Sequence, residues 1–334
     1  MDRIDTVSVT NLQLGYQPSK PLLPQFSVEA IKGELVALIG RNGVGKSTFL
    51  RTIIGTQNPL SGNVNLMGKP VNSLPRLDRA KLLSFVPAEP VRVSNLFIRD
   101  FVAISRFPYR SWNDSLSLHD RDLINQSLSL VGIEHLANRD ISTVSDGERQ
   151  RAMIAFALAQ DTEIILLDEP TAFLDLPNKY ETVRLLSNLA HTKGKTVIYS
   201  THDLQGAMNE ADIIWMMLES GFVHASPEDI AINNIFNEML SQSNVQFDSQ
   251  TGIFKSIKEQ HTPITLEGQG VIYQWTHRML SRLGFKVERD CNLKVLCVNN
   301  GEGNIWLLKD GENLLLTADS ITRLARELQK KIDA

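Results

Sequence analysis

The sequence predicts an α/β fold with a mixed sheet core, an antiparallel β segment and a helical subdomain, followed by a small α+β domain. Short apolar runs of strand length, such as Leu35–Ile39, alternate with segments of helical periodicity and indicate the core. A long helical pattern over about 90–160 lies between strands and indicates the subdomain. Because new strands and a closing helix begin near residue 250, we predict one domain over 1–240 and a second over 250–334.

Composition restricts the possible function classes. The chain has 334 residues, enough for two domains, and a formal net charge of −4 with 22% charged residues. This balance indicates no basic surface for phosphates, so we expect no nucleic-acid partner. The two cysteines, Cys291 and Cys297, lack the spacing of a redox or metal motif and are typical of reduced structural thiols.

The sequence also lacks the usual signals for export or membrane insertion. The N-terminal residues Met1–Asp5 carry no apolar stretch of the kind found in a signal peptide. No apolar run approaches the roughly 18 residues that a membrane-spanning helix needs. We therefore expect a soluble, intracellular protein that reaches a membrane only through a partner.

A glycine-rich loop follows the apolar run Leu35–Ile39. It fits G-x-x-x-x-G-K-[ST], in which curled backbone N–H groups and a helix N-terminus bind phosphates. The lysine of this pattern reaches the outer phosphates, and its Ser47 hydroxyl is a Mg²⁺ ligand. Because a strand precedes the loop and a helical pattern follows it, we predict a nucleotide site. The residues expected to bind the nucleotide here are Gly40, Arg41, Asn42, Gly43, Val44, Gly45, Lys46, Ser47 and Thr48.

The segment before this loop, residues 6–39, alternates in short runs broken by prolines and predicts strands. Tyr16 lies in it. Its ring could stack on an adenine, although from the residue alone a half-buried strand tyrosine is the better interpretation.

Further elements follow the phosphate loop. Alternating residues over 63–67 and the apolar run Ser84–Val86 predict two short strands. Apolar residues at helical spacing predict a helix over Leu118–Leu130, which Gly132 ends. A helix over 145–159 should begin at Ser145, because Ser145 and Glu148 complete a capping box. A helix N-terminus carrying Ser145 and Gly147 could also bind a second phosphate, so both interpretations stay open.

Two carboxylates end the apolar run Ile164–Leu167. A buried strand that carries Asp168 and Glu169 at its carboxyl end suits a nucleotide site in a parallel sheet. Alternation directs the two side chains differently, so Asp168 is expected in the Mg²⁺ shell and Glu169 beside the attacking water. His202 follows the next strand, 196–201, and is expected to contact the γ-phosphate because it ends at the same sheet edge.

In these motifs the chain resembles the ATPase subunit of an ABC transporter. Gly40–Thr48 is similar to the Walker A motif and Ile164–Glu169 to the Walker B motif. Val144–Glu148 resembles the LSGGQ signature, with Asp146 and Glu148 in place of the family's residues. The remaining matches are Tyr16 with the adenine-stacking aromatic, Thr171–Asp175 with the D-loop and His202 with the switch histidine.

The resemblance implies an ATP-hydrolysing enzyme with ATP and Mg²⁺ as cofactors. It implies a head-to-tail homodimer in which Ser145, Gly147 and Glu148 of one copy close over ATP bound by the phosphate loop of the other. Further implied partners are integral-membrane permease subunits and, indirectly, a substrate-binding protein. The chain would then lie at the cytoplasmic face of the cell membrane. The segment Arg106–Tyr109 resembles importers of iron-siderophore, haem and cobalamin complexes, so uptake of a metal chelate is expected.

The chain departs from the family pattern after Ser84–Val86. The family's glutamine should stand at position 88, where this sequence has Ala88 followed by Glu89. Glu89 could replace the glutamine as a Mg²⁺ ligand, because a carboxylate is a good ligand for a hard cation. It could equally face solvent. Both interpretations stay open from the sequence.

The tail from about residue 250 lies outside the minimal ATPase module. Apolar runs predict strands over 263–266, 286–288, 293–298, 305–308 and 314–317, with helices over 271–283 and 319–332. Gly268–Gly270 is interpreted as a turn between a strand and a helix. A regulatory role and a dimerisation role for this domain both stay open.

Two other function classes compete with the importer subunit. One is a soluble ABC-type ATPase that acts on ribosomes or in DNA repair, but such proteins usually carry tandem modules or long coiled coils. This chain has one set of motifs and no sustained heptads. The other is a nucleotide-gated regulatory protein without useful hydrolysis, which the intact Asp168, Glu169 and His202 disfavour.

Overall fold

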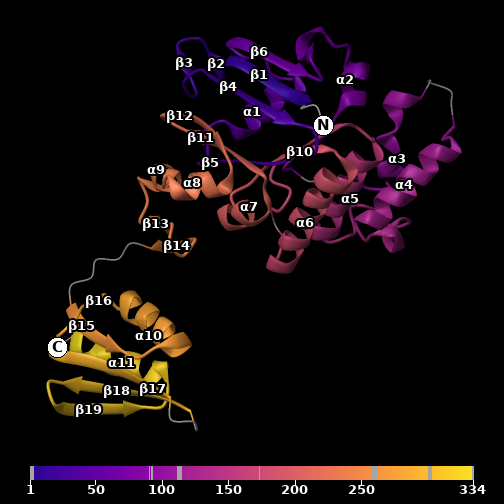
Figure 1. Cartoon of the computed structure of the whole chain (residues 1–334). Coiled ribbons are helices and arrows are strands. Elements are labelled where there is room, and N and C mark those ends of the chain that lie inside the picture. Colours follow the sequence, from indigo (N-terminus) through magenta and orange to yellow (C-terminus); the bar gives the residue numbers. More distant parts are fainter. Residues whose placement is uncertain are drawn as a thin grey trace. The chain divides into compact units, whose positions relative to one another are not determined.

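The computed structural model describes residues 4–89, 91, 93–110, 115–172, 174–256, 262–299 and 303–332. The chain divides into two compact units (Figure 1). The first consists of residues 1–239 and 249–253, and the second of residues 240–248 and 254–334.

The centre of the first unit is a six-stranded sheet in the order β12-β11-β5-β10-β9-β8. The pairs among β11, β5, β10, β9 and β8 are parallel, and β12 pairs antiparallel with β11. Parallel strands covered on both faces read as continuous apolar runs, and β5, β9 and β10 are indeed buried at every residue. The bounds are β5 Leu35–Gly40, β8 Leu83–Val86, β9 Ile164–Leu167, β10 Thr196–Ser200, β11 Ile213–Leu218 and β12 Gly221–Ala225.

An antiparallel sheet in the order β4-β1-β6-β7 forms the predicted β segment. The sequence predicts short separate runs of strand in this segment, whereas β1 continues without a break from Asp5 to Gln13. A register shift at Asn11, which has a φ of 48°, explains the break in the alternation. The bounds are β1 Asp5–Gln13, β4 Phe26–Ile31, β6 Ser61–Leu66 and β7 Lys69–Pro70, with a small hairpin of β2 Gly15–Gln17 and β3 Lys20–Pro21.

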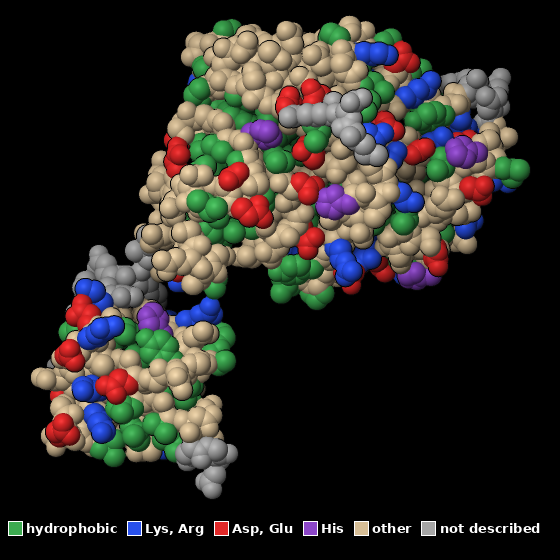
Figure 2. All heavy atoms as spheres, in the orientation of Figure 1, with side chains coloured by type: hydrophobic (Ala, Val, Ile, Leu, Met, Phe, Trp, Pro, Cys, Tyr) green, Lys and Arg blue, Asp and Glu red, His purple; other side chains and the backbone are tan. Residues whose placement is uncertain are grey.

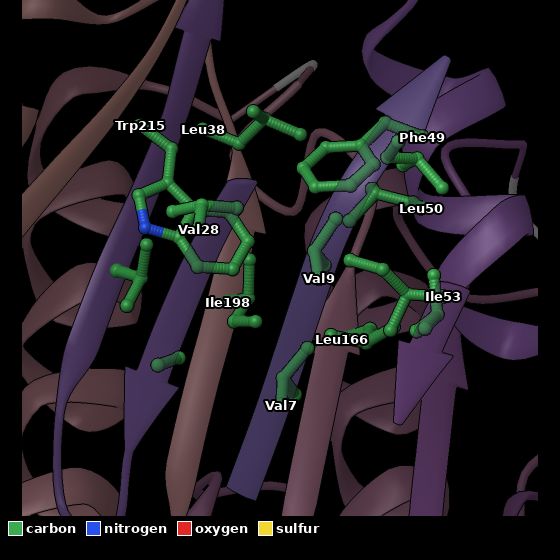
Figure 3. Packing of buried hydrophobic residues seen from close by; sticks show 14 of the residues in the cluster. Val7, Val9, Val28, Leu38, Phe49, Leu50, Ile53, Leu166, Ile198 and Trp215 are labelled. Atoms are coloured by element: carbon green, nitrogen blue, oxygen red, sulfur yellow. The ribbon is translucent and has the colours of Figure 1, made fainter. Parts of the chain in front are cut away.

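Helix α1, Lys46–Ile54, lies between these two sheets. Its fully buried side chains Phe49, Leu50 and Ile53 belong to one cluster with Val7 and Val9 of β1 (Figure 3). From the other side, residues of β5, β9, β10 and β11 complete the cluster, including Leu38, Leu166, Ile198 and Trp215. The first helix after the phosphate loop is therefore fixed by apolar contacts on two sides.

Three helices, α3, α4 and α5, pack together on one side of the first unit and correspond to the predicted helical region (Figure 1). The predicted helix over Leu118–Leu130 agrees with α4 at both ends. The bounds are α3 Ile98–Ile104, α4 Leu118–Leu130 and α5 Asp146–Ala159, with 3₁₀ turns η2 Phe107–Tyr109 and η3 Glu134–Leu136. The other helices are α2 Arg76–Leu82, α6 Leu176–Lys193, α7 Leu204–Glu210, α8 Pro227–Ile232 and α9 Ile235–Leu240, with the turn η1 Val71–Ser73.

The buried side chain of Arg106 joins these helices. Its guanidinium lies 2.7 Å from Oδ1 of Asp120 in α4 and donates hydrogen bonds to the carbonyls of Ala159 and Gln160 at the end of α5. It also stacks on Tyr109, with 4.1 Å between the guanidinium carbon and the ring centre. The segment Arg106–Tyr109 thus has a structural function within the helical region.

The second unit contains a five-stranded sheet in the order β16-β15-β17-β18-β19. The two helices α10 and α11 share one apolar cluster with it, which includes Leu280, Trp306 and Leu324. Every buried member of this cluster lies between residues 264 and 328. The bounds are β13 Val245–Asp248, β14 Ile253–Ser256, β15 Thr262–Glu267, α10 Gly270–Arg282, β16 Phe285–Val287, β17 Leu293–Asn299, β18 Asn304–Asp310, β19 Asn313–Ala318 and α11 Ile321–Ile332.

Basic and acidic side chains are interspersed on the face of the molecule drawn in Figure 2. Among the described helices, none is both long enough and apolar enough to cross a membrane.

We predict that a chain ending at Asn244 folds and binds ATP. The apolar cluster of the first unit draws its buried members from residues 7–217, so this truncation removes none of them. Circular dichroism and binding of a fluorescent ATP analogue would test the fragment against the full chain. An insoluble fragment, or one that no longer binds nucleotide, would show that the tail completes the first domain.

Candidate nucleotide-binding site

The loop between β5 and α1 has the backbone that a phosphate cradle requires. Gly43 and Gly45 have φ values of 81° and 116°, a region that side chains rarely adopt. Gly45 caps α1 without a side-chain hydrogen bond, so the N–H groups of the first turn remain oriented toward an incoming anion. The other residues of the loop differ in exposure: Arg41 and Asn42 are exposed, and Val44 is half-buried. These features fit a bound phosphate chain.

Lys46 lies at the centre of the site. Its side chain is buried, and its Nζ donates a hydrogen bond to the carbonyl of Gly40 at 3.0 Å. Burial lowers the pKa of the ammonium, while the nearby Glu169 and Asp168 act in the opposite direction. The two carboxylates therefore stabilise the positive charge of Lys46, at the place where the outer phosphates would be recognised.

The predicted acid pair follows β9, and a single hydroxyl contacts both members. Oγ of Ser200 donates to Oδ1 of Asp168 at 2.6 Å and accepts from the backbone N–H of Glu169 at 2.9 Å. Glu169 has a φ of 52°, a strained value for a residue with a long side chain. Ser200 was missed in the sequence, although its position at the end of the neighbouring strand β10 was a usable signal.

The predicted partners Glu169 and His202 lie together. Nε2 of His202 is 2.8 Å from Oε1 of Glu169. Burial has the largest effect on the pKa of Glu169 and raises it. The positive charge of Lys46 lowers this pKa, and the negative charge of Asp168 raises it. Burial and the charge of Lys46 lower the pKa of His202, against the attraction of Asp168. The lowered pKa favours the uncharged imidazole, in which one ring nitrogen can donate a hydrogen bond and the other can accept one.

Tyr16 is 65% exposed, unlike the half-buried tyrosine that the residue alone suggested. Its hydroxyl lies 3.0 Å from Oγ1 of Thr48, so it stands beside the first turn of α1. An exposed ring next to the phosphate loop suits base stacking, and this role stays a prediction.

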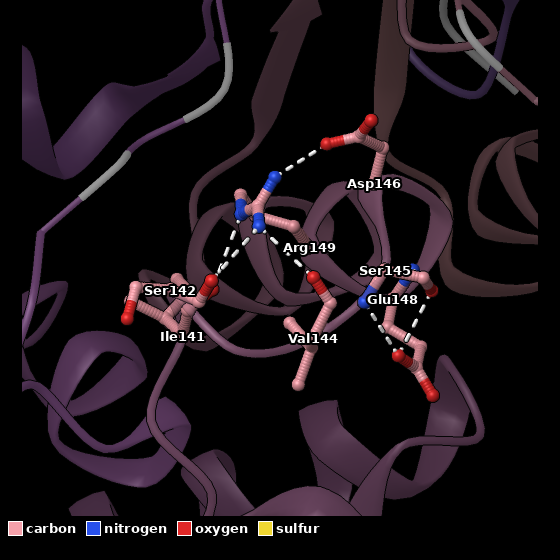
Figure 4. A network of polar contacts seen from close by, with 7 residues as sticks. All are labelled: Ile141, Ser142, Val144, Ser145, Asp146, Glu148 and Arg149. Carbon is pink, nitrogen blue, oxygen red and sulfur yellow. Dashed lines mark hydrogen bonds and ion pairs between the residues drawn. The ribbon is translucent and has the colours of Figure 1, made fainter.

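The predicted cap of helix α5 is present in full (Figure 4). The backbone N–H of Ser145 donates to Oε2 of Glu148 at 2.8 Å, and the N–H of Glu148 donates to Oγ of Ser145 at 3.3 Å. The backbone N–H and the hydroxyl of Ser145 both donate to the Glu148 carboxylate and lower its pKa, the backbone hydrogen bond most. Gly147 lies in the first turn, where a Cβ atom would come within 3.4 Å of the side chain of Leu174. The signature turn is thus close to the segment that resembles the D-loop.

Arg149 holds the loop before α5 and was missed in the sequence. Its buried guanidinium donates to the carbonyls of Ile141, Ser142 and Val144 and also binds the carboxylate of Asp146 (Figure 4). Satisfying several carbonyls at once fixes the loop in one conformation. Asp146, which replaces a family residue, is therefore a partner of Arg149.

The predicted site includes two further segments, one similar to the D-loop and one after β8. In the stretch similar to the D-loop, Thr171 is buried and Asp175 caps α6, whereas Phe173 lies outside the described residues. Past the end of β8, Ala88 is half-buried and Glu89 is exposed. The proposed metal-binding role of Glu89 stays a prediction.

The oxygen donors Ser47 and Asp168 fit Mg²⁺. Mg²⁺ commonly takes one or two protein oxygens and completes its shell with water and substrate phosphates. In the part of the chain that the structure describes, no group of three or more His, Cys, Asp or Glu side chains could hold a metal alone. Such a site would therefore depend on bound nucleotide.

Comparison with known proteins defines the class. Residues 23–172 match the ABC transporter family, and residues 261–329 match the iron ABC transporter C-terminal domain. The chain belongs to the ATP-binding proteins of ABC transporters and is an ATPase.

Known relatives align with about two thirds of the chain. The chain is 35% identical over 236 residues to the achromobactin transport ATP-binding protein of Dickeya dadantii. The aligned region covers 69% of this chain and 87% of that protein. It is 33% identical over 220 residues to the ferric enterobactin transport ATP-binding protein of Escherichia coli, covering 66% and 81% of the two chains.

Solved structures confirm the predicted fold. A dimeric bacterial ABC transporter cassette is 27% identical with a TM-score of 0.59, covering 66% of this chain and 98% of that one. The structure of cbiO1 of Clostridium perfringens, part of the ABC transporter complex cbiONQ, is 25% identical with a TM-score of 0.62, covering 72% and 95%.

We predict that Lys46→Met raises the pKa of His202. The ammonium of Lys46 disfavours the imidazolium, so its removal makes protonation easier and moves the titration to higher pH. Titration of the histidine ring signals by NMR would measure the shift, with His191, which contacts Asp212, as an internal control. An unchanged or lower pKa of His202 would contradict this account of the site.

Proposed function

We propose that this chain hydrolyses ATP to power the uptake of an iron chelate through a partner permease. The observation that carries the ATPase part is the grouping of Lys46, Glu169 and His202 beside the phosphate loop. The iron part is supported by relatives that transport achromobactin and ferric enterobactin and by the match of the tail to the iron ABC transporter C-terminal domain.

In the proposed reaction the N–H groups of the loop and of the first turn of α1 bind the phosphates of ATP. Lys46 neutralises charge that builds up on the outer phosphates. Mg²⁺, held on the protein side by Ser47 and Asp168, would supply further neutralisation.

The Glu169 carboxylate accepts a proton from the attacking water, for which its raised pKa makes it a better base. The neutral His202 orients the carboxylate and contacts the γ-phosphate.

Two copies would form each complete site. Ser145, Gly147 and Glu148 at the start of α5 would close over ATP that is bound by the phosphate loop of the other copy. The rigid loop held by Arg149 supports this role, because a fixed helix N-terminus is a ready anion site. A dimeric solved cassette similar to this chain supports the arrangement. The two copies would act on permease subunits at the cytoplasmic face of the membrane. A substrate-binding protein would supply the permease with its substrate.

We predict that Glu169→Gln lowers ATP turnover by at least about a hundredfold while ATP still binds. The amide keeps the shape of the side chain but cannot accept the proton of the water. His202→Ala should also slow turnover with little change in affinity. Single-turnover hydrolysis and equilibrium binding would separate the two effects, and wild-type turnover in Glu169→Gln would show that the base is elsewhere.

Iron uptake is tested in the source cell. Cells carrying Glu169→Gln should fail to grow when iron is supplied only as a ferric siderophore or haem, and should grow normally on excess iron salt. The exposed Glu312, in the turn between β18 and β19, provides a matched control as Glu312→Gln. Equal growth of the two variants on the chelate would remove the transport assignment and leave the ATPase assignment intact.

We predict that Glu89→Ala lowers Mg²⁺-dependent turnover by about tenfold or more, the value of one charge-assisted contact. Ala88 has no side-chain donor or acceptor, so Glu89 is the available replacement for the family's glutamine. The exposed Glu89 would have to turn inward when nucleotide binds.

The test is a titration of the ATPase rate against Mg²⁺ in both proteins. Superimposable curves would show that Glu89 only faces solvent.

A further inference from the structure

Ser200 is a fully buried polar residue at the last position of β10, and the proposed reaction gives it no function. The parallel register pairs Ile198 of β10 with Leu166 of β9, so Ser200 lies beside Asp168 two residues further on. Ile198 and Leu166 both belong to the apolar cluster around α1. Because side chains alternate along a strand, Ser200 and Asp168 face that same side of the sheet. The register of two buried strands thus places the hydroxyl against the acid.

The hydroxyl makes two hydrogen bonds of opposite direction. It donates to Oδ1 of Asp168 at 2.6 Å, and its oxygen accepts the backbone N–H of Glu169 at 2.9 Å. A hydroxyl whose proton is held by a carboxylate has its lone pairs free for the amide, and each hydrogen bond polarises the other. The side chain of Asp168 and the backbone of Glu169 are therefore joined through a single oxygen atom.

The backbone of Glu169 depends on contacts of this kind. Its φ of 52° is uncommon for a residue with a long side chain and persists where the surroundings hold it. In this turn the Glu169 carboxylate lies 2.8 Å from Nε2 of His202. Without the hydrogen bond to Ser200 the turn could relax toward a commoner conformation, which would move the carboxylate away from its present place.

We propose that Ser200 is a positioning residue that fixes the spacing between Asp168 and Glu169. This inference rests on the proposed function, which makes Asp168 a Mg²⁺ ligand and Glu169 the base. Because Oδ1 of Asp168 is held by the hydroxyl, the carboxylate keeps one orientation toward a metal. The same hydroxyl fixes where the base begins. Groups that hold a ligand commonly change metal affinity or activity by about tenfold or more, and a small misplacement of a base has a similar effect on rate.

The first measurement is single-turnover ATP hydrolysis by the full chain at saturating Mg²⁺. Ser200→Ala removes both hydrogen bonds without adding an atom and should lower the rate at least about tenfold, while the affinity for ATP changes less than about twofold. Ser84→Ala is the matched control and should hydrolyse ATP at nearly the wild-type rate. Ser84 is also buried in this sheet, in β8, but its hydroxyl accepts a hydrogen bond from Thr162 and it pairs with Ile165 near the start of β9.

The second measurement does not depend on turnover. Mn²⁺ replaces Mg²⁺, and its electron paramagnetic resonance signal reports the free ion in the presence of a non-hydrolysable ATP analogue. Ser200→Ala should raise the dissociation constant of Mn²⁺ about tenfold, because Asp168 is no longer held in one orientation. Ser84→Ala should leave it unchanged. A merely structural loss would lower the melting temperature of both variants without separating their metal affinities.

The inference requires both effects. Equal rates or equal Mn²⁺ affinities in Ser200→Ala and Ser84→Ala would overturn it, because a hydroxyl that serves one acid alone does not fix the spacing of two. The proposed function is tested separately by Glu169→Gln. Wild-type turnover in that variant would contradict the assigned base, whereas the Mn²⁺ affinity of Ser200→Ala, measured without turnover, would still report whether Ser200 holds Asp168.

Discussion

The position of the phosphate loop depends on the burial of helix α1 between two sheets. Phe49, Leu50 and Ile53 are fully buried from both sides, which fixes the helix axis and the start of its first turn. Within the loop, Gly43 has open space where a Cβ atom would stand. Because α1 is fixed in the core, the backbone N–H groups of the loop can point toward an anion site before any anion is bound.

The same core sets the electrostatics of the site. β9 and β10 bring Asp168, Glu169 and His202 to the edge where Lys46 lies. Lys46 and Asp168 are buried there, whereas the side chain of His202 is 49% exposed. Burial is the largest influence on the pKa of Lys46, Glu169 and His202, and it disfavours the charged form of each. The mutual attraction of Lys46 and the carboxylates opposes it. The strained backbone of Glu169 holds its carboxylate beside these groups.

Local sequence patterns predicted most of the helices and strands, because such patterns depend on residues that are close together in the sequence. The periodicity of Leu118–Leu130, the capping box at Ser145 and the buried run Ile164–Leu167 each depend on positions a few residues apart. Ser200 and Arg106 were different. Ser200 contacts an acid more than 30 positions earlier, and Arg106 binds carbonyls more than 50 positions later, so only the folded chain brings these groups together. Strand β12 was missed because its residues are only partly buried and show no clear alternation.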